Sequence, residues 1–178
     1  ALTSSANLNN VKIRFEAAVG AGIPLIEVLI DMLKQNKISK ITGIINGTSN
    51  YILSSMHNSN KSFDESLKEA QNLGFAESDP TNDISGFDAM YKASILGSIA
   101  FGGKVPIESI SVKGIENLSQ KDISYSKELG FVIKLLAVTV TENKSSKIYS
   151  KVAPYLVPEN HPLACLLYTS DAADDTCC

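Results

Sequence analysis

Apolar residues recur along the chain at two spacings, one typical of helices and the other of strands. Residues 24–35 open with a proline and then place apolar side chains about one turn apart, at Leu25, Val28, Leu29 and Met32. Residues 87–102 form a second apolar stretch, which follows a turn rich in Asp, Pro and Gly. The pattern predicts a helix over each of these two segments.

Capping signals predict three further helices. Ser62 with Glu65 and Ser119 with Asp122 have the spacing of a capping box, in which a hydroxyl and a carboxylate exchange hydrogen bonds with backbone amides. The first box predicts a helix from about residue 63 to Gly74, and the second a helix over residues 118–131. Residues 48–56 read as a helix capped by Thr48 or Ser49.

The strand pattern is clearest late in the chain. Residues 131–158 contain two runs of β-branched and aromatic residues around the polar turn 142–147, which is typical of a β-hairpin. Shorter strands are predicted at residues 11–15, 38–47 and 108–115. Strands alternate with helices early and pair locally late, so we expect an α/β fold of the α+β type. In it, a mixed β-sheet carries helices packed on one face.

Composition limits the function without identifying it. The 178 residues carry a net charge of −3, are 44% hydrophobic and 20% charged, and contain no apolar run long enough to span a membrane. This balance gives no electrostatic reason to expect nucleic acid, and no membrane partner is indicated. The sequence predicts a cytoplasmic domain.

The last fourteen residues differ from the rest. Residues 165–178 contain all three cysteines, Cys165, Cys177 and Cys178, and residues 165–175 resemble a translated sequencing adapter. We therefore expect residues 1–164 to form the domain, and residues 165–178 to be a non-native tail that packs against nothing. Since the chain starts at Ala1 without Met, we also expect it to be an internal piece of a longer protein.

The segment "GFAESDPTNDISGFDAMYK", residues 74–92, is the strongest candidate site. Asp88 and Lys92 are four residues apart, so they share one face of the predicted helix. The positive end of a helix dipole disfavours a protonated lysine, which suits a proton donor, and Asp88 would orient the amine. A solvent-facing ion pair explains the same spacing and is the simpler interpretation of it.

Two other groups of residues each have a ligand-binding and a structural explanation. Glu77, Asp79 and Asp83 crowd one loop, where they could bind an ammonium group or form a solvated turn. Glu16 precedes a turn of small residues, "AAVGAGIP", whose carbonyl groups could bind a hard cation together with the carboxylate. A plain Gly-rich turn before a helix explains the same residues.

Four motifs, taken together, carry a resemblance to a known family. "FEAAVGAGIP", "GIINGTSNYIL", "EAQNLGFAESDPTNDISGFDAMYKASIL" and "VAPYLVPENHPLA" resemble homoserine dehydrogenases, in the order and spacing of that family. The resemblance covers about residues 11–164. It implies an oxidoreductase that interconverts L-aspartate 4-semialdehyde and L-homoserine with NADP or NAD, in threonine, methionine and isoleucine biosynthesis.

The resemblance also implies roles for individual residues. Lys92 matches the proton-donating lysine and Asp88 the aspartate beside it, while Glu77, Asp83 and Asp88 match substrate contacts. Gly74 matches a position next to the cofactor. A monovalent cation, usually sodium, is implied at the Glu16 side chain and at three backbone carbonyls, those of Val19, Ala21 and Ile23.

The family's nucleotide-binding half is missing from this sequence, because "GAG" at residues 20–22 lacks the third glycine of a dinucleotide-binding motif. We therefore expect the fragment to be inactive alone and the complete enzyme to form a homodimer through the sheet. A different class of function also stays open: a non-catalytic dimerisation module that has lost its hydride chemistry.

Overall fold

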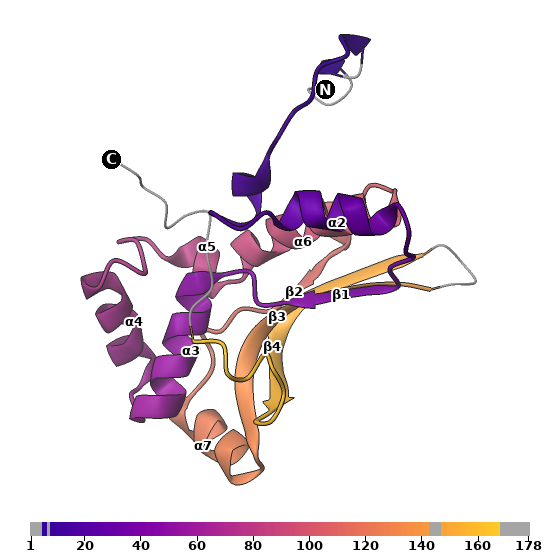
Figure 1. Ribbon diagram of the computed structural model, residues 1–178. Coiled ribbons are helices and arrows are strands. Elements are labelled where there is room, and N and C mark those ends of the chain that lie inside the picture. The colour runs from indigo at the N-terminus through magenta and orange to yellow at the C-terminus, as the bar shows by residue number, and fades with distance from the viewer. Residues whose placement is uncertain (1–4, 7, 143–146, 168–178) are drawn as a thin grey trace.

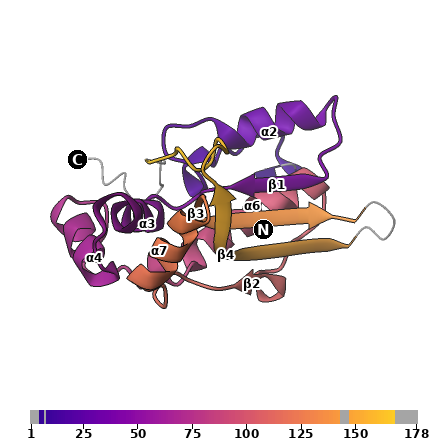
Figure 2. The ribbon, with the colours of Figure 1, turned by 90° about the horizontal axis from the view of Figure 1, so that it is seen from below.

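A computed structural model of the chain describes residues 5–6, 8–142 and 147–167. Its four strands form one sheet in the order β1-β3-β4-β2, as Figure 2 shows. The pairs β1–β3 and β3–β4 are antiparallel and β2–β4 is parallel, so the sheet is mixed. The strand bounds are β1 (Lys40–Gly43), β2 (Ser111–Val112), β3 (Phe131–Thr141) and β4 (Ile148–Pro158).

The predicted hairpin is confirmed. Strands β3 and β4 pair along their whole length, from Phe131 opposite Pro158 to Thr141 opposite Ile148. Most of the predicted turn, residues 143–146, lies outside the described residues. Strand β1 pairs with the far end of β3, and this leaves the other end of β3 beside helix α3 (Gly47–Ser59) in Figure 1.

Both predicted capping boxes are present, at Ser62–Glu65 and Ser119–Asp122. In each, the serine hydroxyl accepts a hydrogen bond from the backbone amide three residues later, and the carboxylate accepts one from the serine amide. The helices besides α3 are α2 (Leu25–Leu33), α4 (Phe63–Asn72), α5 (Thr81–Ile84), α6 (Phe87–Phe101) and α7 (Gln120–Glu128). Two short 3-10 turns, η1 (Glu16–Ala18) and η2 (Ile107–Ser109), also lie within the described residues.

Two local predictions are wrong. Residues 11–15 are not a strand; they form part of an arm that extends away from the body in Figure 1, where no neighbouring strand pairs with them. Helix α3 is capped by Asn46 rather than by Thr48 or Ser49, because the Asn46 side chain accepts the amide hydrogen bond of Ser49. The short helix α5, inside the acidic loop, was not predicted.

The two faces of the sheet are covered differently. Ile133, Leu135 and Ala137 point to one face, where they pack with buried residues of α3, α6 and α7, such as Ile52, Ala93 and Ile123. Their neighbours Val132 and Leu136 point to the other face, where they pack with Val157, Ile44 and Ala164. The prediction of a mixed sheet with helices on one face is therefore confirmed.

Lys134 lies on the same face of β3 as Val132 and Leu136, at the end of the strand that α3 reaches, and is only 1% exposed. Its ammonium donates hydrogen bonds to Asn50 Oδ1 at 2.8 Å, to Ser54 Oγ at 3.0 Å and to the Leu166 carbonyl at 2.7 Å. The Asn50 amide donates to the carbonyls of Leu166 and Leu167, both at 3.1 Å. The expectation that residues 165–178 contact nothing is wrong for residues 166 and 167. Residues 168–178, with Cys177 and Cys178, lie outside the described residues.

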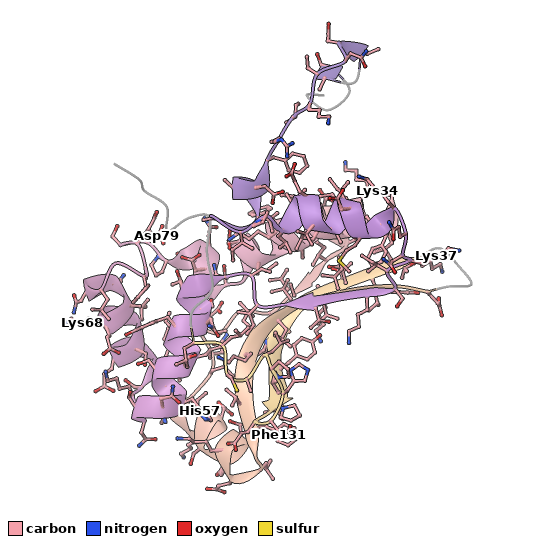
Figure 3. The ribbon with its side chains drawn as sticks, in the orientation of Figure 1. Lys34, Lys37, His57, Lys68, Asp79 and Phe131 are labelled. Carbon is pink, nitrogen blue, oxygen red and sulfur yellow. The ribbon has the colours of Figure 1, made fainter. Side chains whose placement is uncertain are left out.

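We predict that Lys134 makes stability depend on pH. Burial lowers the pKa of Lys134 from 10.5 to about 8. Between these values the unfolded chain holds a proton that the folded chain has lost, so stability rises with pH, by up to about 1.4 kcal/mol per pH unit. Urea unfolding of Lys134→Met from pH 7.5 to 10 should lack this rise. Lys68→Met, which removes an exposed lysine of α4 (Figure 3), should keep it. Equal slopes for Lys134→Met and the unmodified chain would contradict the prediction.

Candidate active site

Helix α6 places Asp88 and Lys92 one turn apart, as their spacing predicts. The Lys92 Nζ lies 2.9 Å from Asp88 Oδ2, and the two side chains are 3% and 22% exposed. The pair is therefore not a solvent-facing one. Burying an ammonium group costs several kcal/mol unless a counter-charge and hydrogen bonds compensate. Asp88 is the more exposed member of the pair.

Gly86 fixes where α6 begins. Its φ is +82°, and a Cβ atom there would come within 3.3 Å of Cγ1 of both Val112 and Val152. A side chain is therefore excluded by the backbone conformation and by the strands β2 and β4 beneath it. This close approach seats the first turn of α6, with Asp88, directly on the sheet.

Asn46 joins the two carboxylates that face α3. Its side-chain amide donates to Asp83 Oδ1 at 2.7 Å and to Asp88 Oδ2 at 3.0 Å. Its side-chain carbonyl accepts from the Ser49 amide at 2.8 Å. We call Asn46, Asp83, Asp88 and Lys92 the carboxylate cluster. Sequence reasoning missed Asn46, although an Asn directly before Gly-Thr-Ser is a helix-capping signal.

The first turn of α3 also holds the backbone of the acidic loop. Thr48 Oγ1 donates to the Phe75 carbonyl at 2.6 Å, and Ser49 Oγ donates to the Asp83 carbonyl at 2.7 Å. Both side chains are buried. The loop is thus fixed near its start and near its end. The exposed residues between these two points therefore do not determine the position of the carboxylate cluster.

The predicted acids of the loop separate into two kinds. Asp83 belongs to the cluster, whereas Glu77 and Asp79 are exposed. Asp79, at the outer edge in Figure 3, accepts hydrogen bonds from the hydroxyl and the amide of Thr81, and these lower its pKa. This contact suits a turn-forming role. Glu77 projects from a segment that Gln71 holds through the Glu77 carbonyl at 3.1 Å.

Gly74 ends helix α4 in a left-handed conformation, with φ +83°. Its amide donates to the Gln71 carbonyl at 3.2 Å, and the next amide, of Phe75, donates to Ala70 at 2.8 Å. A Cβ atom at Gly74 would meet no atom within 4 Å. The backbone turn alone therefore explains the glycine, and the surface beside it is open.

Glu16 has a structural contact that the sequence did not predict. Its two carboxylate oxygens accept from the amides of Ile26, at 2.8 Å, and Glu27, at 2.7 Å. These amides lie in the first turn of α2, so Glu16 caps a helix that begins nine residues after it. Of the other predicted cation ligands, Val19 and Ala21 are buried and Ile23 is exposed.

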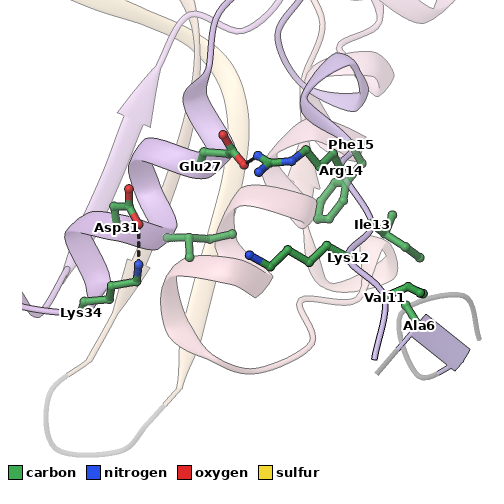
Figure 4. A pocket seen from close by; sticks show the side chains of 10 residues that line it. Ala6, Val11, Lys12, Ile13, Arg14, Phe15, Glu27, Asp31 and Lys34 are labelled. Carbon is green, nitrogen blue, oxygen red and sulfur yellow. Dashed lines mark hydrogen bonds and ion pairs between the residues drawn. The ribbon is translucent and has the colours of Figure 1, made fainter. Parts of the chain in front are cut away.

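A hollow of about 510 Å³ lies away from the carboxylate cluster, between the N-terminal arm and α2 (Figure 4). Lys34 pairs with Asp31 at 2.7 Å along its wall, and Arg14 forms an ion pair with Glu27 across it. Its lining includes none of the predicted site residues. The volume of a hollow therefore does not identify the candidate active site in this chain.

Comparison with known proteins identifies relatives. The profile of a family described as "Homoserine dehydrogenase" matches residues 24–174. The chain is 44% identical over 163 residues to homoserine dehydrogenase of Bacillus subtilis, and 47% identical over 162 residues to that of Synechocystis. These alignments cover 92% and 90% of this chain.

A solved structure agrees with the sequence relatives. The crystal structure of a homoserine dehydrogenase from Thiobacillus denitrificans superimposes with a TM-score of 0.88 at 43% identity, over 94% of this chain. The matched part is 37% of the length of the two curated relatives and 38% of the Thiobacillus chain. Within the part of the chain that the structure describes, no helix is long and apolar enough to cross a membrane.

We predict that removing the Glu16 carboxylate destabilises α2. Glu16→Ala leaves two amides of the helix N-terminus without their acceptor, a loss of about 1 kcal/mol in the free energy of unfolding. Hydrogen exchange at the first turn of α2 should accelerate, and urea unfolding should measure the loss. Glu27→Ala is the matched control, because it removes the exposed ion pair with Arg14 and one first-turn carboxylate but leaves both amides capped, and it should cost only about 0.5 kcal/mol. Equal costs for the two variants would show that Glu16 does not cap the helix.

Proposed function

We propose that this chain, which belongs to the homoserine dehydrogenase family, is the substrate-binding and proton-donating part of such an enzyme. The complete enzyme would interconvert L-aspartate 4-semialdehyde and L-homoserine with NADP or NAD. The pairing of the buried Lys92 with Asp88, 2.9 Å apart beside the acidic loop, is the observation that carries this proposal. The chain matches 37% of the length of its curated relatives, so the nucleotide-binding part is proposed to lie outside these residues.

Lys92 has the chemistry that the reduction requires. Reducing the aldehyde adds a hydride, which the nicotinamide supplies when bound, to the carbon, and a proton to the oxygen. Lys92 donates that proton and is left as a neutral amine, which solvent reprotonates. In the direction of homoserine oxidation, the neutral amine accepts the hydroxyl proton. Asp88 accepts a hydrogen bond from the ammonium and fixes its direction.

The acidic loop is proposed to bind the amino end of the substrate. Glu77 is exposed, so its carboxylate is available to a substrate ammonium. Asp83 and Asp88 place two further carboxylates on the same side of α3, through their shared contact with Asn46. Gly74 is exposed three residues before Glu77, and its open surface leaves room for the cofactor to approach.

The turn after Glu16 is proposed to hold a monovalent cation, sodium being the expected one. Glu16 and the carbonyls of Val19, Ala21 and Ile23 form an all-oxygen donor set, which suits a hard cation. The fold supports the fit, because the Val19 and Gly20 amides both donate to the Glu16 carbonyl at 3.0 Å, which folds the turn over that residue. A cation bound there would join the arm to the start of α2.

The face of the sheet opposite Ile133 and Leu135 is proposed to pair two subunits. It presents apolar side chains to solvent, including the partly exposed Val138 and Val140 and the exposed Tyr149. We also propose that the protein acts in the cytoplasm. A dimer without homoserine-dependent reduction of NADP or NAD would instead support the non-catalytic dimerisation module.

Replacing Lys92 should affect turnover far more than substrate affinity. Lys92→Met keeps the buried volume but removes the proton donor, so kcat of the complete enzyme should fall roughly 10²–10⁴-fold. Steady-state kinetics of homoserine oxidation measure this, with folding verified by circular dichroism. Lys61→Met is the control, since it removes a lysine paired with Glu69 at 2.6 Å on another surface. A folded Lys92→Met enzyme with unchanged kcat would end the acid–base assignment.

Replacing Glu77 should act on a different kinetic parameter. Glu77→Gln weakens a contact that the ground state and the transition state share, so KM for homoserine should rise with little change in kcat. A charge-assisted contact of about 1.5–3 kcal/mol implies a rise of roughly tenfold or more. Glu128→Gln, at an exposed position on α7, should leave KM unchanged. If Glu77→Gln lowers only kcat, the substrate-contact role is wrong.

A further inference from the structure

The buried side-chain amide of Asn46 contacts two carboxylates and also caps a helix. It is 2% exposed, and its two amide protons reach different segments, Asp83 in α5 and Asp88 in α6. These segments are joined only by the short turn around Gly86. Two carboxylates that face the same amide repel each other, and the amide offsets part of this repulsion by donating to both.

The oxygen of Asp88 that Asn46 contacts is also the one that contacts the lysine. Asp88 Oδ2 lies 3.0 Å from Asn46 Nδ2 and 2.9 Å from Lys92 Nζ. That oxygen therefore links the amide of Asn46 to the ammonium of Lys92. Asn46 itself is immobilised, because its carbonyl caps α3 through the Ser49 amide at 2.8 Å.

From this geometry we propose that Asn46 is a positioning residue, which holds Asp88, and through it Lys92, in the orientation needed for proton transfer. The inference rests on the proposed function, since it assigns Asn46 a part in the same proton transfer. A positioning error of about 1 Å can cost roughly 10²-fold in rate. The capping role alone would affect only the stability of α3.

Two substitutions separate positioning from capping. Asn46→Asp and Asn46→Ser both keep an oxygen that can accept the Ser49 amide, so both should fold. Neither presents two amide protons to Asp83 and Asp88. The Asp variant adds a third carboxylate to the cluster, whereas the Ser variant is neutral. Ser119→Ala, which removes the cap of α7, is the control for lost capping without any change at the cluster.

We expect kcat for homoserine oxidation by the complete enzyme to fall roughly 10- to 100-fold in both Asn46 variants, with a smaller change in KM. The Asp variant should regain activity relative to the unmodified enzyme as pH falls, because its added carboxyl group, once protonated, can donate one hydrogen bond. The charged groups that face it are Asp83 on α5 and Asp88 and Lys92 on α6. The Ser variant should show no such recovery, and Ser119→Ala should keep its kcat.

The folding and the kcat of the two Asn46 variants decide whether Asn46 is a positioning residue. If both variants fold and retain kcat within twofold, or if neither folds, Asn46 has only a structural role and the proposal is overturned. If one fails to fold, kcat of the other decides. Inactivity of the unmodified enzyme with homoserine and both NAD and NADP would instead remove the proposed function, which is a separate result.

Discussion

A lysine ammonium that is almost fully withdrawn from water is the constraint around which this domain is arranged. Lys92 is 2% exposed, and an uncompensated charge at such a position would cost more free energy than a small domain can spare. Asp88 supplies the counter-charge, Asn46 holds Asp88, and Gly86 lets the first turn of α6 rest on β2 and β4. Helix α3 contributes through its N-terminus, where side chains reach both ends of the acidic loop. The site is thus built from three segments that only the folded sheet brings together.

Glu16 and Gly74 each have a structural role in addition to a proposed functional one. Glu16 caps α2 through two amides, yet a carboxylate has lone pairs in excess of two hydrogen bonds and can still meet a cation. Gly74 ends α4 because of its backbone conformation, and the open surface beside it follows from the missing side chain. At both positions, the observed geometry fits the structural role and the functional role. Only substitutions that remove one role and keep the other can therefore distinguish them.

Sequence periodicity predicted the elements whose signals are local. The hairpin, the helix through Lys92 and both capping boxes were visible because their partners lie within a few residues, or face each other across one turn. Residues 11–15 were predicted wrongly, because a β-branched run specifies a strand only where another strand is available to pair. The role of Asn46 was invisible for a related reason: its acceptors Asp83 and Asp88 are 37 and 42 residues away.

The two buried lysines show the limit of local reasoning most clearly. Lys92 has a counter-ion one helical turn away, so its sequence context already suggested a charged pair. The sequence neighbours of Lys134 are those of a buried strand and give no sign of its partners. The acceptors of its three hydrogen bonds are 84, 80 and 32 residues away in the sequence. Those acceptors are neutral, which satisfies the ammonium protons without a counter-charge, and burial then lowers the pKa of Lys134 to about 8. One of its contacts reaches the segment that follows Ala164 and is made to a backbone carbonyl, that of Leu166, which also accepts a hydrogen bond from Asn50. Such contacts tolerate changes of side chain at residue 166, so Lys134 can hold this segment whatever residue stands there, whereas Lys92 depends on the identity of Asp88.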